Sequence, residues 1–280
     1  MARLDFACLA VALWLGAGTG TLAASDWAAG GSAADVTRDL AASNAPDLTG
    51  KCDVRIDISL SIGGETRSAA LDDFDGVFDK LVERFGCRTL TLSAFTASAF
   101  PIAMMVFDLT AAPKPPICKI TPSTDPVCHV YPKASVCTQP PRDVIEKCDR
   151  DKAEQLDRWS SRHQAVLASA RRFLASLKTM DGPGSHTAIY ANAAYGLAQA
   201  QDVVILTDGD SDSPWPEPGQ PKTITVRPSA RLIFLLVKGT NDPTGAKAMA
   251  HAIEAQRAFP NSIVVPLQAA LAPSFWDGLR

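Results

Sequence analysis

Hydrophobic and polar residues alternate along IDISLSI, residues 56–62, as they do in a strand with one polar face. The polar positions are Asp57, Ser59 and Ser61. Aspartate and serine form strands poorly and suit the end of a strand, where the chain turns. Two interpretations are therefore open: an amphipathic strand with unfavourable residue choices, or a cluster of oxygen atoms held for a hard cation.

Strand-like and helix-like patterns alternate along the rest of the chain. Alternate apolar residues over 54–58 predict a first strand, and apolar residues over 71–85 recur at helical spacing before a stop at Gly86. This alternation predicts an α/β fold with three layers, doubly wound around a mainly parallel sheet. The later pattern predicts strands within 89–95, 104–110, 203–210, 231–237 and 262–267, and helices within 156–177, 188–200 and from 241 onwards.

The N-terminal 24 residues have the layout of a secretory signal. Arg3 precedes an apolar run over residues 6–15, and small residues follow as far as Ala24. The alternative, an uncleaved membrane anchor, requires a longer apolar run to cross a bilayer. We therefore expect residues 1–24 to be a signal peptide and the exported protein to be periplasmic or secreted, without a membrane span.

Composition divides the remaining chain into three parts. Residues 25–50 are rich in Ala, Gly, Ser and Asp and predict a linker, followed by the α/β domain over 51–280. Residues 112–148 contain four cysteines and eight prolines, which predicts a disulfide-rich insertion within that domain.

The overall charge bears on the class of partner. The formal net charge is −3, and no cluster of lysine and arginine forms a stripe for phosphate groups. This charge distribution leads us to expect no nucleic-acid partner. The hydrophobic content of 46% leaves enough apolar residues for a sizeable core.

Removal of a signal peptide leaves six cysteines. An even number in an exported chain predicts disulfides, and a zinc site is disfavoured because no pair has C-x-x-C spacing. The candidate disulfide residues are Cys52, Cys87, Cys118, Cys128, Cys137 and Cys148.

Five hydroxyl or carboxylate residues follow predicted strands or precede a predicted helix. Asp57 ends the first strand, and Ser59 and Ser61 lie in the turn after it. Thr187 lies in the loop GPGSHT before a helix, and Asp208 follows the strand VVIL. Ligands of such sheets bind at the carboxyl ends of the strands, so the fold can bring these oxygens, which suit Mg²⁺, to one edge.

These residues resemble the metal ion-dependent adhesion site of von Willebrand factor A domains. The matching pieces are D-x-S-x-S at 57–61, Thr187 in a Gly-rich loop before a helix, and Asp208 in LTDG. The resemblance covers roughly residues 51–111 and 149–280. Only the D-x-S-x-S core of the first motif matches, and the insertion is not part of the common domain.

The resemblance implies a binding function. The five residues would hold Mg²⁺, with Mn²⁺ or Ca²⁺ as alternatives, and a vacant coordination position would accept an Asp or Glu carboxylate from a protein partner. Because the arrangement contains no obvious nucleophile or general base, we expect the protein not to be an enzyme.

The family's topology also implies a disulfide arrangement. The first two strands are parallel neighbours in that topology, so Cys52 and Cys87 could bond across the end of the sheet opposite the metal. The four cysteines of the insertion would then pair among themselves, with Cys118–Cys148 favoured. The insertion would leave the third strand at that same end, as a stabilising elaboration or, as a less favoured alternative, a second binding surface.

Three further residues are candidates for a partner-binding rim around the metal. Asp210 either is a solvated loop residue or tunes the choice of metal and partner, and His186 is either a rim residue or a spectator. Trp215, between two prolines, either anchors a partner or folds back onto the domain. By contrast, His163 falls on the apolar stripe of a predicted helix and is interpreted as a packed side chain.

Three functions therefore compete. The first is an exported module that binds a partner through a metal-bridged carboxylate. The second is a scaffold or assembly factor of the same fold that acts independently of metal. The third, disfavoured, is a glycosyltransferase that uses Asp208-Gly209-Asp210 as a D-x-D metal motif, because secretion would separate it from nucleotide-sugars.

Overall fold

The computed structural model describes residues 47–98, 100–109, 142–180, 182, 187–211, 223–239, 242 and 246–279. The predicted signal peptide, most of the linker and residues 112–141 of the insertion lie outside these ranges, as do His186 and Trp215. All described residues belong to one structural unit, Ala33–Arg280.

A six-stranded sheet forms the centre of this unit, with the strand order β3-β2-β1-β4-β5-β6. Neighbouring strands are parallel except β3, which runs antiparallel to β2 at one edge. The predicted α/β fold with a mainly parallel sheet is therefore confirmed. The strands are β1 Lys51–Asp57, β2 Thr89–Phe95, β3 Ala103–Asp108, β4 Asp202–Thr207, β5 Arg231–Leu236 and β6 Ile263–Pro266.

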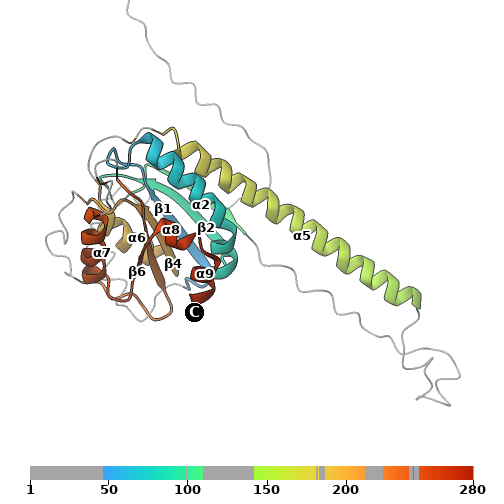
Figure 1. Ribbon diagram of the computed structural model, residues 1–280. Coiled ribbons are helices and arrows are strands. Elements are labelled where there is room, and N and C mark those ends of the chain that lie inside the picture. The colour runs from blue at the N-terminus through green and yellow to red at the C-terminus, as the bar shows by residue number, and fades with distance from the viewer. Residues whose placement is uncertain are drawn as a thin grey trace, which may run out of the picture. The chain divides into compact units, whose positions relative to one another are not determined.

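Helices cover both faces of the sheet (Figure 1). Side chains of α2, α5, α8 and α9 pack in the hydrophobic cluster on one face, and those of α6 and α7 pack in the cluster on the other. The helices are α2 Gly64–Phe85, α5 Arg142–Leu177, α6 Ile189–Gln199, α7 Ala246–Ala258, α8 Leu267–Ala270 and α9 Pro273–Gly278. Within the described ranges, no helix is both long enough and apolar enough to cross a membrane.

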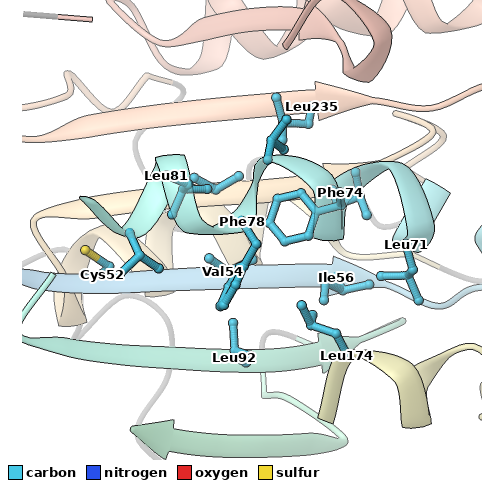
Figure 2. Packing of buried hydrophobic residues seen from close by; sticks show 14 of the residues in the cluster. Cys52, Val54, Ile56, Leu71, Phe74, Phe78, Leu81, Leu92, Leu174 and Leu235 are labelled. Carbon is cyan, nitrogen blue, oxygen red and sulfur yellow. The ribbon is translucent and has the colours of Figure 1, made fainter. Parts of the chain in front are cut away.

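Alternate residues of β1 face the two helical layers. Val54 and Ile56 are fully buried and lie beside the rings of Phe74 and Phe78 on α2 (Figure 2). Helix α2 ends at Gly86, whose φ of 61° places it in the left-handed region that ends helices. The predicted stop of this helix at Gly86 is confirmed, and the strand face that packs on it follows the apolar alternation.

A disulfide joins Cys52 at the start of β1 to Cys87, which precedes β2, so the predicted pairing of these two residues is confirmed. Cys148, on α5, also forms a disulfide, and its partner lies outside the described ranges. The favoured Cys118–Cys148 pairing therefore stays a prediction.

Helix α5 begins earlier than its apolar stripe indicates. It starts at Arg142, so residues 142–148, which we assigned to the insertion, form its first two turns. Residues 143–155 of the helix are mostly exposed and polar, and they lack the periodic apolar positions that reveal a helix in a sequence. Within the stripe, His163 stacks on Trp159 with ring centroids 5.0 Å apart.

Candidate functional site

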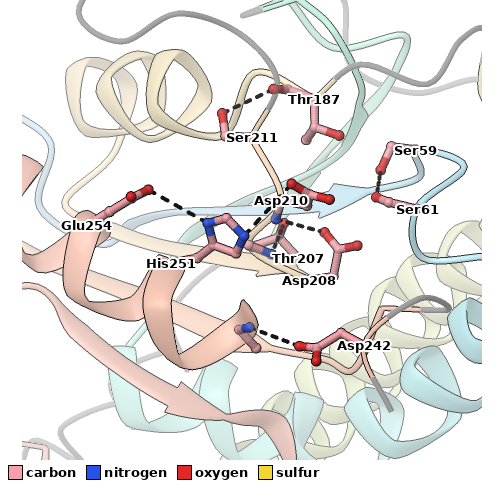
Figure 3. Close-up of polar contacts among 12 residues, drawn as sticks. Ser59, Ser61, Thr187, Thr207, Asp208, Asp210, Ser211, Asp242, His251 and Glu254 are labelled. Atoms are coloured by element: carbon pink, nitrogen blue, oxygen red, sulfur yellow. Dashed lines mark hydrogen bonds and ion pairs between the residues drawn. The ribbon is translucent and has the colours of Figure 1, made fainter. Parts of the chain in front are cut away.

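The five predicted metal ligands lie at the carboxyl end of the central strands. Four of them, Ser59, Ser61, Thr187 and Asp208, are labelled in Figure 3. Asp57 is the last residue of β1, and Ser59 and Ser61 lie in the loop between β1 and α2. Asp208 directly follows β4, and Thr187 precedes α6 by two residues. Because β1 and β4 are parallel neighbours, with Ile56 opposite Leu206, their carboxyl ends meet at the same edge.

Asp57 is almost completely buried, with 1% of its surface exposed. Its Oδ1 accepts a hydrogen bond from the backbone N–H of Ser59 at 2.9 Å, and its Oδ2 accepts one from the Thr207 hydroxyl at 2.7 Å. Burial nevertheless raises the pKa of the Asp57 carboxyl from 3.8 to about 7, and the nearby Asp208 carboxylate adds to this rise. The charged form of Asp57 is therefore incompletely compensated by its neighbours.

Ser59, Ser61 and Asp208 form a connected set of oxygens. The hydroxyl oxygens of Ser59 and Ser61 are 2.9 Å apart and share a hydrogen bond. Burial raises the pKa of Asp208, and hydrogen bonds from the Ser61 side chain and the Asp210 backbone N–H oppose this rise. Two hydroxyls and a partly desolvated carboxylate thus converge on the same space.

Thr187 places a hydroxyl at this edge that no other described residue bonds. Its side chain is completely buried, and no group of the described residues bonds its Oγ1. Its backbone oxygen, by contrast, accepts a hydrogen bond from the Ser211 hydroxyl at 3.1 Å. A buried polar group left unpaired costs about 1–3 kcal/mol, a cost that a ligand bound to this hydroxyl would remove.

A cavity of about 20 Å³ lies beside Ser61 and Asp208, which is enough for one water molecule or one ion. Gly239, just after β5, lies so close that a Cβ at this position would be 2.9 Å from Oδ2 of Asp208. The absence of a side chain at Gly239 therefore keeps this space open. The remaining lining residues are Asp210, Asp242 and Lys247, of which sequence reasoning selected only Asp210.

Asp242 combines a place in the cavity wall with a role at the start of α7. Its Oδ1 accepts a hydrogen bond from the backbone N–H of Ala246, and its Oδ2 accepts one from that of Ala248, at 3.1 and 3.0 Å. Asp242 therefore bonds the first turn of α7, which begins at Ala246 and so later than the predicted opening at residue 241. The sequence Asn-Asp-Pro indicated a helix start in this region and gave no sign of a nearby cavity.

The predicted rim residue Asp210 is half-buried and faces a histidine that the sequence did not single out. Oδ1 of Asp210 lies 3.8 Å from Nε2 of His251 on α7, and Nδ1 of the same ring lies 3.7 Å from Glu254. The other two predicted rim residues, His186 and Trp215, lie outside the described ranges.

Arg67 on α2 contacts the loop that carries Ser59 and Ser61. This buried guanidinium donates hydrogen bonds to the backbone oxygens of Ile58 and of Lys178, at 3.2 and 3.3 Å. Gly182 passes so close to the same loop that a Cβ there would be 2.3 Å from the Ile58 oxygen. The β1–α2 loop is therefore fixed against the segment that follows α5.

The donor set suits a hard cation, since it consists only of hydroxyl and carboxylate oxygens. It has two carboxylates among five residues, and within the described ranges no group of three or more His, Cys, Asp or Glu side chains is arranged to hold a metal. The unpaired Thr187 hydroxyl and the raised pKa values of both carboxyls are the features that a bound cation would satisfy. Comparisons of the chain with protein-family models, curated proteins and solved structures found no match.

Proposed function

We propose that this chain is an exported binding module, similar to von Willebrand factor A domains, that engages a protein partner through a divalent cation. The cation, Mg²⁺ or alternatively Mn²⁺ or Ca²⁺, would be held by Asp57, Ser59, Ser61, Thr187 and Asp208. The parallel pairing of β1 and β2 and the Cys52–Cys87 disulfide match what the resemblance implies and support the proposal.

The observation that carries the proposal is the buried hydroxyl of Thr187. Among the described residues Oγ1 of Thr187 has no partner, and a valine would fill the same space without the cost of an unpaired hydroxyl. A cation gives the hydroxyl a partner, and the same cation compensates the two carboxyls whose charged forms burial disfavours.

The bound cation would supply an electrophilic centre for a partner's carboxylate. Mg²⁺ usually keeps some coordination positions for water or a further oxygen ligand, so a partner's carboxylate could bind an ion that this chain holds with only two carboxylates. The partner would therefore be a protein that exposes an aspartate or glutamate side chain. This chemistry is binding, and the proposal assigns no catalytic step to the chain.

Metal binding is tested by calorimetric titration of Mn²⁺ into the oxidised protein and two variants. We expect one site in the wild type, loss of binding in Asp208→Ala, and unchanged binding in Asp149→Ala, which removes an exposed carboxylate from α5. No binding by the wild type would refute the metal-dependent function and favour a scaffold that acts independently of metal.

The open coordination position is tested by water-proton relaxation of the Mn²⁺-loaded protein. We expect acetate, the simplest carboxylate, to displace exchangeable water from the bound ion and lower the relaxation enhancement. Chloride at the same ionic strength is the control, since it screens charge equally and is a poorer ligand for a hard cation. An enhancement that acetate leaves unchanged would contradict a vacant position for a partner's carboxylate.

Export is the remaining part of the proposal. The Cys52–Cys87 disulfide supports it, because such bonds persist in oxidising compartments. Intact-mass analysis of protein recovered outside the cytoplasm should give a chain that begins at Ser25, and a mature chain that retains Met1 would contradict the predicted signal peptide.

A further inference from the structure

A buried polar chain runs from β1 to the helix that follows Thr187. On the face of β1 that packs on α6, Asp53 and Arg55 are both buried, with exposed fractions of 2% and 1%. Nε of Arg55 donates a hydrogen bond to Oδ2 of Asp53 at 2.8 Å, and its NH1 donates one to Oδ1 of Asn192 at 2.6 Å. The proposed ligand set uses none of these three residues.

The side-chain nitrogen of Asn192, Nδ2, contacts the segment that begins with Thr187. This nitrogen donates hydrogen bonds to the backbone oxygens of Ala188 and of Ser98, at 2.9 and 2.8 Å. The backbone N–H of Ala188 in turn donates to the oxygen of Thr96 at 2.9 Å. Both backbone polar groups of the residue next to Thr187 are therefore bonded, and Asn192 ties that residue to the segment after β2.

The Arg55 guanidinium is itself held in place from several sides. It lies over the ring of Tyr195, 4.6 Å from the ring centroid, in addition to its bonds to Asp53 and Asn192. Gly196 lets α6 approach closely, because a Cβ there would be 3.3 Å from Nε of Arg55. The acceptor side of the Asn192 amide is thus fixed, which orients its donor side toward Ala188 and Ser98.

A purely stabilising role does not account well for this arrangement. A buried ion pair is often no more stabilising than apolar residues of the same volume, and Oδ1 of Asp53 has no hydrogen-bond partner among the described residues. The contacts of Asp53, Arg55 and Asn192 do, however, end one residue from Thr187, whose hydroxyl would have to hold a fixed position to bind the proposed cation.

We propose that Asn192, oriented by Arg55, is the positioning residue that sets Thr187 for cation binding. This inference rests on the proposed function, because it assigns a role relative to the bound metal. Residues that orient metal ligands through hydrogen bonds typically change metal affinity by about 10–100-fold when they are replaced. We expect an effect of this size on Mn²⁺ affinity when Asn192 loses its donor atoms.

Two variants of Asn192 separate positioning from folding. Asn192→Ala removes all contacts of the amide and leaves the Arg55 guanidinium without this partner. Asn192→Asp keeps an acceptor for Arg55 and lacks the donors to Ala188 and Ser98, so it retains the Arg55 contact and still removes the proposed function of the residue.

Gln201 offers a matched control at the opposite end of β4. Its side chain also bridges two backbone segments: Oε1 accepts from the N–H of Gly50 at 3.1 Å, and Nε2 donates to the oxygen of Ser229 at 2.8 Å. Gln201→Ala therefore removes a comparable amide bridge far along the strand from the proposed ligands. Its effect on stability can be compared with that of the Asn192 variants.

The decisive measurement is the Mn²⁺ dissociation constant of each variant, at a temperature where thermal unfolding shows all of them folded. We expect Asn192→Asp to bind about 10–100-fold more weakly than the wild type and Gln201→Ala to bind as the wild type does. In a double-mutant cycle, adding Asn192→Asp to Thr187→Ala should weaken binding no further, since Asn192 acts through Thr187.

Wild-type affinity in folded Asn192→Asp would overturn the inference, as would an equal loss in Gln201→Ala or additive losses in the cycle. These outcomes leave the metal site intact and so differ from failure of the proposed function, in which the wild type itself binds no Mn²⁺ and the inference falls with it.

Discussion

Replacement of Asp57 by asparagine should make the metal-free protein more stable, and the gain should grow with pH. Asparagine keeps the shape of the side chain, and its Oδ1 can still accept from the Ser59 N–H. The hydroxyl of Thr207, which donates to Asp57, can instead accept a hydrogen bond from the new Nδ2. The substitution therefore removes the buried charge with little other change.

The magnitude follows from the raised pKa of Asp57. Between pH 3.8 and about 7 the folded protein holds a proton on Asp57 that the unfolded chain has lost. Stability of the wild type therefore falls as the pH rises through this window and becomes constant above it. Each pH unit in the window corresponds to about 1.36 kcal/mol, so the two units from pH 5 to pH 7 give about 3 kcal/mol. The asparagine variant lacks this dependence.

The assay is urea unfolding of both proteins with a chelator present, at pH 5 and at pH 8. The variant should gain about 3 kcal/mol in unfolding free energy relative to the wild type between these two conditions. Asp149→Asn, at an exposed carboxylate, should follow the wild type at both pH values. A difference between Asp57→Asn and the wild type that is the same at pH 5 and pH 8 would refute the reasoning.

Two further substitutions test the disulfide at the start of β1 and the cavity beside Asp208, where the proposed cation would lie. Replacing Cys52 and Cys87 together by serine opens a loop with a sequence separation of 35 residues. In the chain-entropy account this lowers the free energy of unfolding by about 4 kcal/mol. Thermal unfolding should then show a fall of roughly 8–15 °C in Tm. Gly239→Ala places a Cβ 2.9 Å from Oδ2 of Asp208 and should weaken Mn²⁺ binding with little change in Tm; unchanged affinity in calorimetry would contradict the assigned space.

Much of the fold follows from apolar periodicity because each strand has a simple environment. Strand β4 is buried along its whole length, which matches its continuous apolar run, and β2 begins and ends at the predicted residues. Helix α5 is an element whose first half apolar periodicity does not predict. Its N-terminal half projects few side chains into a core, so its sequence carries no apolar stripe there, and only the C-terminal half could be predicted.

The five oxygen-bearing residues could be placed at one edge of the sheet because the carboxyl ends of parallel strands meet there. The supporting residues could not be found in this way. Asp53 and Arg55 occupy alternate positions on a strand, where polar residues ordinarily face solvent, and they are buried only because α6 covers that face. Asn192 lies in an apolar helix, and nothing local in the sequence shows that its amide meets a guanidinium from β1.

The contacts made by the loop after β5 and by helix α7 also could not be predicted from the sequence. Asp242 and Lys247 reach the cavity beside Asp208 from a segment far along the chain, and His251 reaches Asp210 from one turn further. Two glycines let these segments approach: a Cβ at Gly239 would be 2.9 Å from Oδ2 of Asp208, and a Cβ at Gly209 would be 2.8 Å from Cβ of His251. Sequence patterns locate residues relative to their own element, and these contacts depend on distances between elements.

The buried charges of β1 differ in how they are compensated, and this difference links stability to the proposed function. Asp53 has Arg55 as its cationic partner, whereas no lysine, arginine or histidine within the described ranges forms an ion pair with Asp57. A bound divalent cation would provide that missing partner and stabilise the folded state by about 2.7 kcal/mol at a hundredfold excess over its Kd. The same carboxylate thus lowers the stability of the metal-free protein and, in the proposed function, would raise its affinity for metal. Substitutions that remove the buried charge of Asp57 should therefore stabilise the metal-free protein and abolish its affinity for metal.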